Sequence, residues 1–140
     1  MQETKLPKTA RISIVDDDAS MREAINTLIS SLGLSVDEFL SAEDFLKSGR
    51  VHTFDCLILD VRMPGLDGLE LQRRLIAANI TIPIVFITAH YREDQRRIAM
   101  ESGAIAFLRK PFTEQELLDA INASLLIRNR SADDDDEERV

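Results

Sequence analysis

The sequence has a single cysteine, Cys56, and no tryptophan among its 140 residues. One cysteine excludes an intrachain disulfide, so the fold must be held together by its core. A chain of this length buries roughly two-thirds of its unfolded surface, which suffices for one domain without a structural metal. Cys56 itself lies in an apolar run, which predicts a small buried hydrophobe and not a reactive thiol.

No apolar run approaches the length of a membrane span, and the N-terminus lacks the apolar core of a signal peptide. We therefore expect no contact with a membrane and a cytoplasmic location. The sequence also lacks a P-loop and a glycine-rich nucleotide fingerprint, so ATP or GTP binding is unsupported.

Basic residues are in the minority, and the net charge is −8. Six consecutive acids, at 133–138, account for most of this, because removing them from the 25 acids leaves 19 against 17 Lys plus Arg. The folded part is nearly balanced, which predicts no direct nucleic-acid binding. We expect residues 1–9 to be a flexible lead-in, 10–127 to form one domain and 128–140 to be a disordered acidic tail.

Short apolar runs alternate with amphipathic segments along the chain. The predicted strands are Ile12–Val15, Leu34–Phe39, Cys56–Leu59, Ile84–Ile87 and Ile105–Leu108. The helices between them begin at capping signals, namely Ser20, Ser41, Asp67 and the capping box Thr113–Glu116, with one charged helix at about Arg92–Ser102. Such alternation predicts an α/β fold, a doubly wound parallel sheet with helices on both sides.

The first predicted helix carries apolar residues on one face from Met21 to Leu32, and Gly33 suits the left-handed turn that ends it. The run Cys56–Leu59 is apolar throughout, which is typical of a strand buried on both faces. It leads directly into Asp60, and Pro64-Gly65 ends the segment.

Polar side chains follow four of the five strands. They are Asp16 and Asp17 after the first, Asp60 after the third, Thr88 after the fourth and Lys110 after the fifth. Parallel strands bring their carboxyl ends to one edge of the sheet, where ligands bind in such folds. Carboxylates crowded there need a cation, and oxygen ligands suit Mg²⁺.

These groups are those that phosphoryl transfer requires. A carboxylate can act as the nucleophile and form an aspartyl phosphate. A metal ion and a lysine can neutralise the equatorial oxygens of the transferred group, and a threonine hydroxyl can donate to one of them.

In order and spacing, four pieces of this sequence resemble the receiver domain of bacterial two-component response regulators. They are Val15–Asp18, Leu59–Asp60 with Met63-Pro64 and Asp67-Gly68, Ile87–Ala89, and Lys110–Phe112. The resemblance covers about residues 11–126 and implies a flavodoxin-like (βα)5 fold with strand order 2-1-3-4-5. It also implies a phosphorylation-controlled signalling switch that is not an enzyme acting on other substrates.

By the same resemblance Asp60 is the phosphoacceptor, and the Mg²⁺ ligands are Asp60, Asp17, Asp16 through water, and the backbone carbonyl of Arg62. Thr88 and Lys110 would contact the phosphoryl oxygens. A cis bond between Lys110 and Pro111 would aim the lysine at Asp60.

Arg62 and His90 occupy variable positions that look like the FixJ-type branch and would flank the hydrolytic water, although both also fit plain solvated loop residues. Phe107 matches the aromatic switch position that would respond to Thr88. Asp18 fits a role at a helix start better than a metal site. The charged segment from Arg92 to Arg97 fits a solvated helix face.

The implied partners are a sensor histidine kinase or a histidine phosphotransfer protein. A downstream target, or a second copy, would bind the face of the fourth helix, fifth strand and fifth helix. FixJ-type regulators usually carry a DNA-binding domain, and the acidic tail is more typical of a natural end than of a linker. Two alternative functions remain. One is a hydrolase of the haloacid dehalogenase type, but such enzymes need a second Asp at the position that Arg62 occupies here. The other is a receiver-like module that no longer accepts phosphate.

Overall fold

The computed structural model describes residues 10–138, with side chains described through Arg128. The expected lead-in, residues 1–9, lies outside this range. The elements are β1 (Arg11–Val15), α1 (Ala19–Ser30), β2 (Ser35–Phe39), α2 (Ala42–Lys47), a short 3₁₀ helix (Val51–Thr53), β3 (Cys56–Asp60), α3 (Gly68–Ala77), β4 (Ile84–Thr88), α4 (Glu93–Glu101), β5 (Ala106–Arg109) and α5 (Glu114–Glu138).

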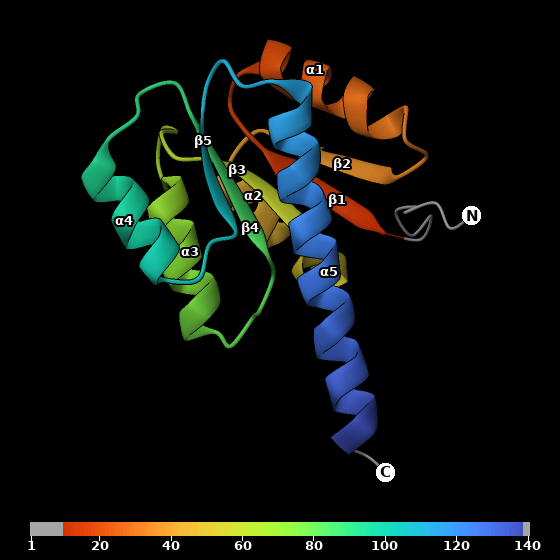
Figure 1. Cartoon of the computed structure of the whole chain (residues 1–140). Helices are drawn as coiled ribbons and strands as arrows, with labels where there is room; N and C mark the ends of the chain where they lie inside the picture. Colours follow the sequence, from red (N-terminus) through yellow and green to blue (C-terminus); the bar gives the residue numbers. More distant parts are fainter. Residues whose placement is uncertain (1–9, 139–140) are drawn as a thin grey trace.

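The five strands form one parallel sheet in the order β2-β1-β3-β4-β5 (Figure 1). β3 is central, and its Ile58 pairs with Ile14 of β1 on one side and Val85 of β4 on the other. The chain order of the strands reverses at β1, so the crevice between the β1 and β3 carboxyl ends is the position where doubly wound folds bind ligands. The predicted fold class and strand order are confirmed.

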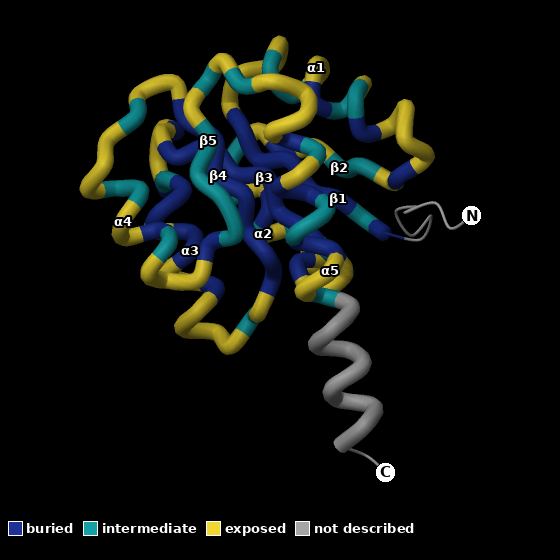
Figure 2. The backbone as a smooth tube through the Cα atoms, in the orientation of Figure 1, coloured by how far each residue is buried: buried dark blue, intermediate teal, exposed yellow. Residues whose placement is uncertain are grey.

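The sheet separates two apolar half-cores. α1 and α5 cover one face, where they pack on Ile14, Ile58 and Ile87, whereas α2, α3 and α4 cover the other, where Leu57 and Phe86 lie. Successive residues of a strand point to opposite faces, so one buried strand supplies both half-cores. All positions of β3 and β4 are buried, as the continuous apolar run predicted (Figure 2). A rigid, dry strand therefore leads to Asp60.

The N-cap of the first helix lies two residues earlier than predicted. Asp18, not Ser20, is the N-cap: its backbone is extended, and its carboxylate accepts from the N–H groups of Ser20 and Met21. A carboxylate in this position also interacts favourably with the positive end of the helix dipole, whereas a neutral serine hydroxyl carries no charge for that interaction. The helix ends at Ser30, so Leu32 lies beyond it and is exposed, and Gly33 has a φ of 83° as the predicted left-handed turn requires.

The other predicted caps are confirmed. The hydroxyl of Ser41 accepts from the Asp44 N–H, and the carboxylate of Asp67 accepts from the Glu70 N–H. Two reciprocal bonds of 2.9 and 3.0 Å close the capping box before α5, joining the N–H of Thr113 to the Glu116 side chain and the N–H of Glu116 to the Thr113 hydroxyl.

α5 differs from the expectation at its C-terminal end. A disordered tail was expected from residue 128, but the backbone stays helical through Glu138. Extending an existing helix adds one hydrogen bond for each residue fixed, which is far less demanding than starting one. None of the helices within residues 10–138 has the length and apolar character needed to cross a membrane.

Candidate functional site

Asp60 is the last residue of β3 and is 6% exposed. The chain turns sharply after it: the Gly68 N–H donates to the Val61 carbonyl at 2.9 Å, and a Cβ on Gly68 would lie 2.3 Å from the Asp60 carbonyl oxygen. Only glycine permits this approach. The Arg62 N–H donates to Asp60 Oδ1 at 3.2 Å, which leaves Oδ2 free to face the site.

The three acids after β1 have three different environments. Asp16 is fully buried, and its Oδ1 accepts from the Asp18 N–H at 2.9 Å. Asp17 is exposed, and Asp18 caps α1 as described above. The guanidinium of Arg22 donates to the Asp16 carbonyl at 2.7 Å, a contact that the sequence did not indicate. Asp16 and Asp17 therefore face the site while Asp18 belongs to the helix.

Lys110 joins the two buried carboxylates. Its Nζ lies 2.9 Å from Asp16 Oδ2 and 3.4 Å from Asp60 Oδ2, although 94 and 50 residues separate it from them in the chain. Its backbone N–H donates to the Thr88 carbonyl at 2.8 Å, and this bond holds the loop after β5 beside the end of β4. The Lys110–Pro111 peptide bond is cis, as predicted.

Crowding and burial set the charge state of this group. Burial, then the hydrogen bond and charge of Asp16, raise the pKa of Asp60 to about 7, although Lys110 opposes the rise. Burial acts to lower the pKa of Lys110, but its hydrogen bond to Asp16 and the charge of Asp60 outweigh this, so the pKa lies above the ordinary value. The site thus holds more negative charge than one lysine neutralises.

A divalent cation would balance this excess. Asp16, Asp17 and Asp60 each offer a carboxylate oxygen, and these oxygens lie within 4.8 Å of one another. The donor set is oxygen only, which suits Mg²⁺ or Ca²⁺ and not a soft metal. Burial and the neighbouring Asp16 carboxylate raise the pKa of Asp60 and so disfavour its charged form, an effect that a bound cation would oppose. The residues present therefore fit the magnesium ion that the sequence predicted.

Thr88 ends β4 and is fully buried. Its hydroxyl oxygen accepts from the His90 N–H at 3.1 Å, so the hydroxyl proton remains available to another acceptor. The intervening Ala89 is exposed, as are the side chains of His90 and Arg62. Both variable residues therefore lie at the solvent side of the edge.

Phe107 lies on β5 with partial burial, between two other aromatic rings. Its centroid is 5.8 Å from Phe86, inside the core, and 5.8 Å from Tyr91, in edge-to-face geometry. The guanidinium carbon of Arg109 lies over the Tyr91 ring, 4.4 Å from its centroid. Sequence reasoning missed Tyr91, although it is the only tyrosine and stands three residues after Thr88.

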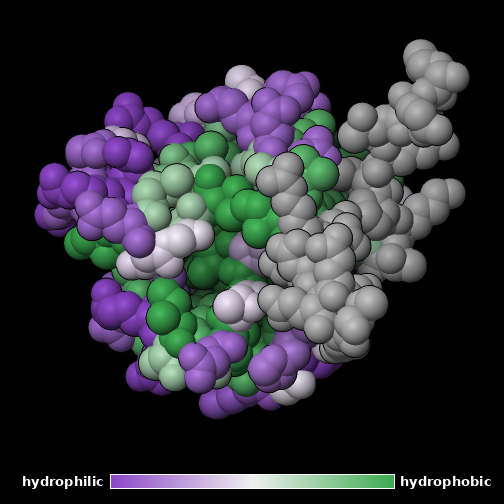
Figure 3. Space-filling view, turned by 60° about the horizontal axis from the view of Figure 1, so that its bottom comes forward, coloured by the Kyte–Doolittle hydropathy of each residue, from purple (hydrophilic) through white to green (hydrophobic). Residues whose placement is uncertain are grey.

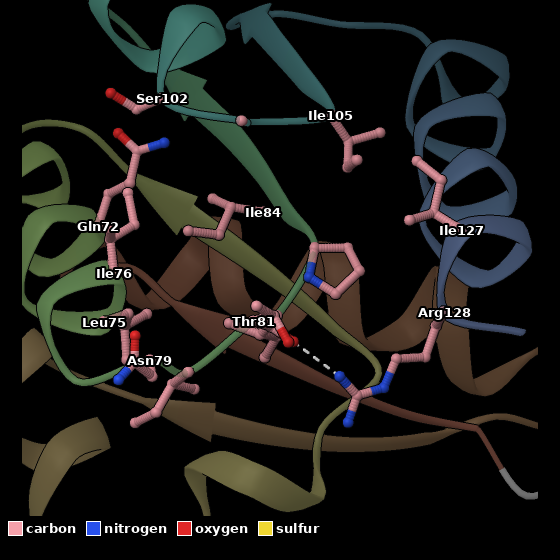
Figure 4. A pocket seen from close by; sticks show the side chains of 14 residues that line it. Gln72, Leu75, Ile76, Asn79, Thr81, Ile84, Ser102, Ile105, Ile127 and Arg128 are labelled. Carbon is pink, nitrogen blue, oxygen red and sulfur yellow. Dashed lines mark hydrogen bonds between the residues drawn. The ribbon is translucent and has the colours of Figure 1, made fainter. Parts of the chain in front are cut away.

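An apolar hollow lies at the opposite edge of the sheet. It has a volume of about 410 Å³ between the end of α3, the start of β4, the segment before β5 and α5. Its walls are mostly aliphatic, including Ile76, Ile84 and Ile127, and the Arg128 side chain donates to the Thr81 carbonyl at its rim (Figures 3 and 4). None of the predicted site residues lines it.

Fold and site together define a flavodoxin-like α/β protein with a carboxylate-and-lysine cluster at the carboxyl edge of its sheet. The response regulator receiver domain family matches residues 12–122. The chain belongs to this family, whose members are the receivers of two-component systems.

Several relatives and solved structures are similar over most of the chain. The transcriptional regulatory protein TdiR of Thauera aromatica is 39% identical over 139 residues, covering 99% of this chain and 61% of the relative. Nodulation protein W of Bradyrhizobium diazoefficiens is 46% identical over 121 residues, covering 86% and 53%. The response regulator StyR superposes with a TM-score of 0.86 at 44% identity, covering 94% of this chain and 66% of that one.

The receiver fragment FixJ-N superposes with a TM-score of 0.74 at 31% identity and covers 89% of this chain and 95% of that one. The resemblance to the FixJ-like receivers is thereby confirmed. The chain spans about half to three-fifths of the length of the curated relatives it matches.

Proposed function

We propose that this domain accepts a phosphoryl group on Asp60 and works as a signalling switch. The observation that supports this most directly is the approach of Lys110 Nζ to Asp16 at 2.9 Å and to Asp60 at 3.4 Å, because it gathers nucleophile, metal-binding acid and cation at one point. A histidine kinase, a histidine phosphotransfer protein or a small phosphodonor would supply the group.

In the reaction an Asp60 carboxylate oxygen attacks phosphorus and forms an acyl phosphate. The bond from phosphorus to the donor breaks, and its electron pair leaves with the donor imidazole or carboxylate. Lys110 stabilises charge on the phosphoryl oxygens, and the Thr88 hydroxyl donates to one of them. Bound Mg²⁺, held by Asp16, Asp17, Asp60 and the Arg62 carbonyl, would neutralise developing charge on the same oxygens.

The output follows from the same contacts. A new anionic acceptor on Asp60 draws the Thr88 hydroxyl inward, since a hydrogen bond to a charged group is strong. Phe107 then moves into the space that Thr88 leaves. The exposed surface of α4, β5 and α5 changes, and with it the affinity for a target protein or a second copy. The domain would turn over only its own phosphate.

Mass spectrometry of the protein after treatment with acetyl phosphate and Mg²⁺ tests the proposal. We expect one acid-stable, hydroxylamine-labile phosphoryl group, mapped to Asp60, and none when the metal is chelated. A group on another residue, or equal uptake without metal, would contradict the assignment. If Asp60 is phosphorylated but neither self-association nor partner affinity changes, the proposed switch is wrong, and only the role of Asp60 as phosphoacceptor stands.

A further inference from the structure

The loop 61–67 connects the acceptor strand β3 to α3 and carries Arg62. It is anchored at its ends by the backbone: the Val61 N–H donates to the Ile87 carbonyl at 3.1 Å, and the Gly68 N–H closes back on Val61. The Arg62 N–H also donates to Asp60 itself. A shift of this loop would therefore move the main chain of Arg62 relative to the acceptor carboxylate.

The far side of the loop is held by a residue of α2. The Leu66 N–H donates to Glu43 Oε2 at 2.9 Å, across 23 residues of sequence. Among residues whose side chains are described, Glu43 is the one residue outside 60–67 whose side chain hydrogen-bonds to the backbone of this loop.

The loop is shaped to receive this carboxylate. Gly65 has a φ of +76°, and a Cβ built on it would lie 2.5 Å from Glu43 Oε2, so any larger residue would displace the acid. The hydrogen bond from the Leu66 N–H is the main cause of a lowered pKa for Glu43, so the Glu43 carboxylate stays ionised. Ser41 caps α2 and fixes the turn from which Glu43 projects.

We propose that Glu43 is a positioning residue for the phosphoryl-transfer site: from α2 it holds loop 61–67 so that the Arg62 main chain stays in place beside Asp60. This inference rests on the proposed function, in which the Arg62 carbonyl is a ligand to Mg²⁺. Glu43 itself touches neither the metal site nor the acceptor. It acts through the loop, as residues that orient metal ligands do.

The test is an NMR titration with Mg²⁺ alone, followed by single-turnover phosphorylation with acetyl phosphate at saturating Mg²⁺. Glu43→Ala removes the acceptor of the Leu66 N–H, and we expect the Mg²⁺ dissociation constant to rise about three- to tenfold. Glu43→Gln keeps an acceptor oxygen without the charge and should remain within about twofold of wild type. Asp44→Ala removes an equal charge from the exposed neighbouring position and is the matched control.

Wild-type Mg²⁺ affinity and rate in a folded Glu43→Ala protein would overturn the proposal. So would equal losses in Glu43→Gln or Asp44→Ala, because long-range charge would then explain the effect. If Glu43→Ala does not fold, Gly65→Ala breaks the same contact from the loop side and should weaken Mg²⁺ binding likewise. Wild-type protein that binds Mg²⁺ but takes no phosphate would refute the proposed function, while the Mg²⁺ titration would still decide the role of Glu43.

Discussion

The two edges of the sheet differ in kind. At the carboxyl edge, the buried carboxylates of Asp16 and Asp60 both lie within reach of the Lys110 ammonium. At the amino edge, the 410 Å³ hollow is lined mainly by aliphatic side chains, and the Arg128 guanidinium in its lining already has a carbonyl partner. The hollow and the charged groups therefore lie at different edges of the sheet. The carboxyl edge holds the carboxylates and the lysine, whereas the hollow at the amino edge is bordered by side chains of the apolar core.

The largest expected effect separates the edges by chemistry. Asp60→Asn should abolish phosphate uptake, by at least about 1000-fold, because an amide is not a nucleophile at phosphorus. Ile127→Ala, at the rim of the hollow, should leave the rate within about twofold. Acetyl phosphate reactions followed by mass spectrometry measure both. Uptake that survives in Asp60→Asn would place the acceptor elsewhere.

The second effect concerns stability. Leu75 lies on the inner wall of the hollow and is buried in the half-core under α2–α4, so Leu75→Ala should cost about 3 kcal/mol of unfolding free energy. Phosphorylation per folded molecule should not change. Urea unfolding gives the first quantity and stoichiometric phosphorylation the second. If fully folded Leu75→Ala protein took up less phosphate than wild type, phosphorylation at the carboxyl edge would depend on the amino edge as well.

The third effect depends on pH. In metal-free protein the pKa of Asp60 is raised to about 7 by burial and by Asp16, from an ordinary value of 3.8. Between these values the folded protein keeps a proton that the unfolded chain has lost, so this contribution to stability is full below about pH 4 and is lost as pH rises through 7. The amide of Asp60→Asn does not titrate in this range. The free energy of unfolding of the variant minus that of wild type should therefore be about 2 kcal/mol larger at pH 8 than at pH 5.

Urea unfolding in the presence of a metal chelator measures this difference at both pH values. Millimolar Mg²⁺ should reduce it, because the cation binds the folded wild-type carboxylates. An advantage of Asp60→Asn that is equal at pH 5 and pH 8 would show that the crowded carboxylates carry no excess charge.

The smallest effect concerns the end of α5. Deleting residues 131–140 should change the melting temperature by no more than about 2 °C, because the acids at 133–138 stand at the negative end of the helix dipole and repel one another. Thermal unfolding measures it. A fall of many degrees would show that the amino edge of the domain depends on this segment.

Periodicity and composition predicted much of the fold, because buried strands and capped helices are local patterns. β3 and β4 are apolar throughout, and the parallel topology then placed Asp60 and Thr88 at one edge. The bounds of β5 differ by one residue, because the strand is Ala106–Arg109 and not the predicted Ile105–Leu108. The choice of Asp18 over Ser20 as a cap depended on backbone dihedrals, which neighbouring polar residues do not reveal.

The contacts that sequence reasoning missed join residues distant in the chain or depend on side-chain orientation. Glu43 meets the loop of Asp60 only because α2 and the β3–α3 segment pack side by side. Tyr91 contacts Phe107 and Arg109 only once β5 lies beside β4. The amino-edge hollow likewise depends on how four separate segments approach one another, and no spacing of residues encodes that.

Cys56 gives the chain a native reporter of its own opening. It is fully buried in the half-core under α1 and α5, and burial raises the pKa of its thiol to about 12. A disulfide reagent can react with it only in molecules whose core has opened, so at rapid reclosing the labelling rate measures the population of open molecules. Since no other cysteine is present, the signal comes from a single position at the start of the sheet's central strand. Labelling before and after acetyl phosphate treatment would therefore compare the local opening free energies of the untreated and treated protein.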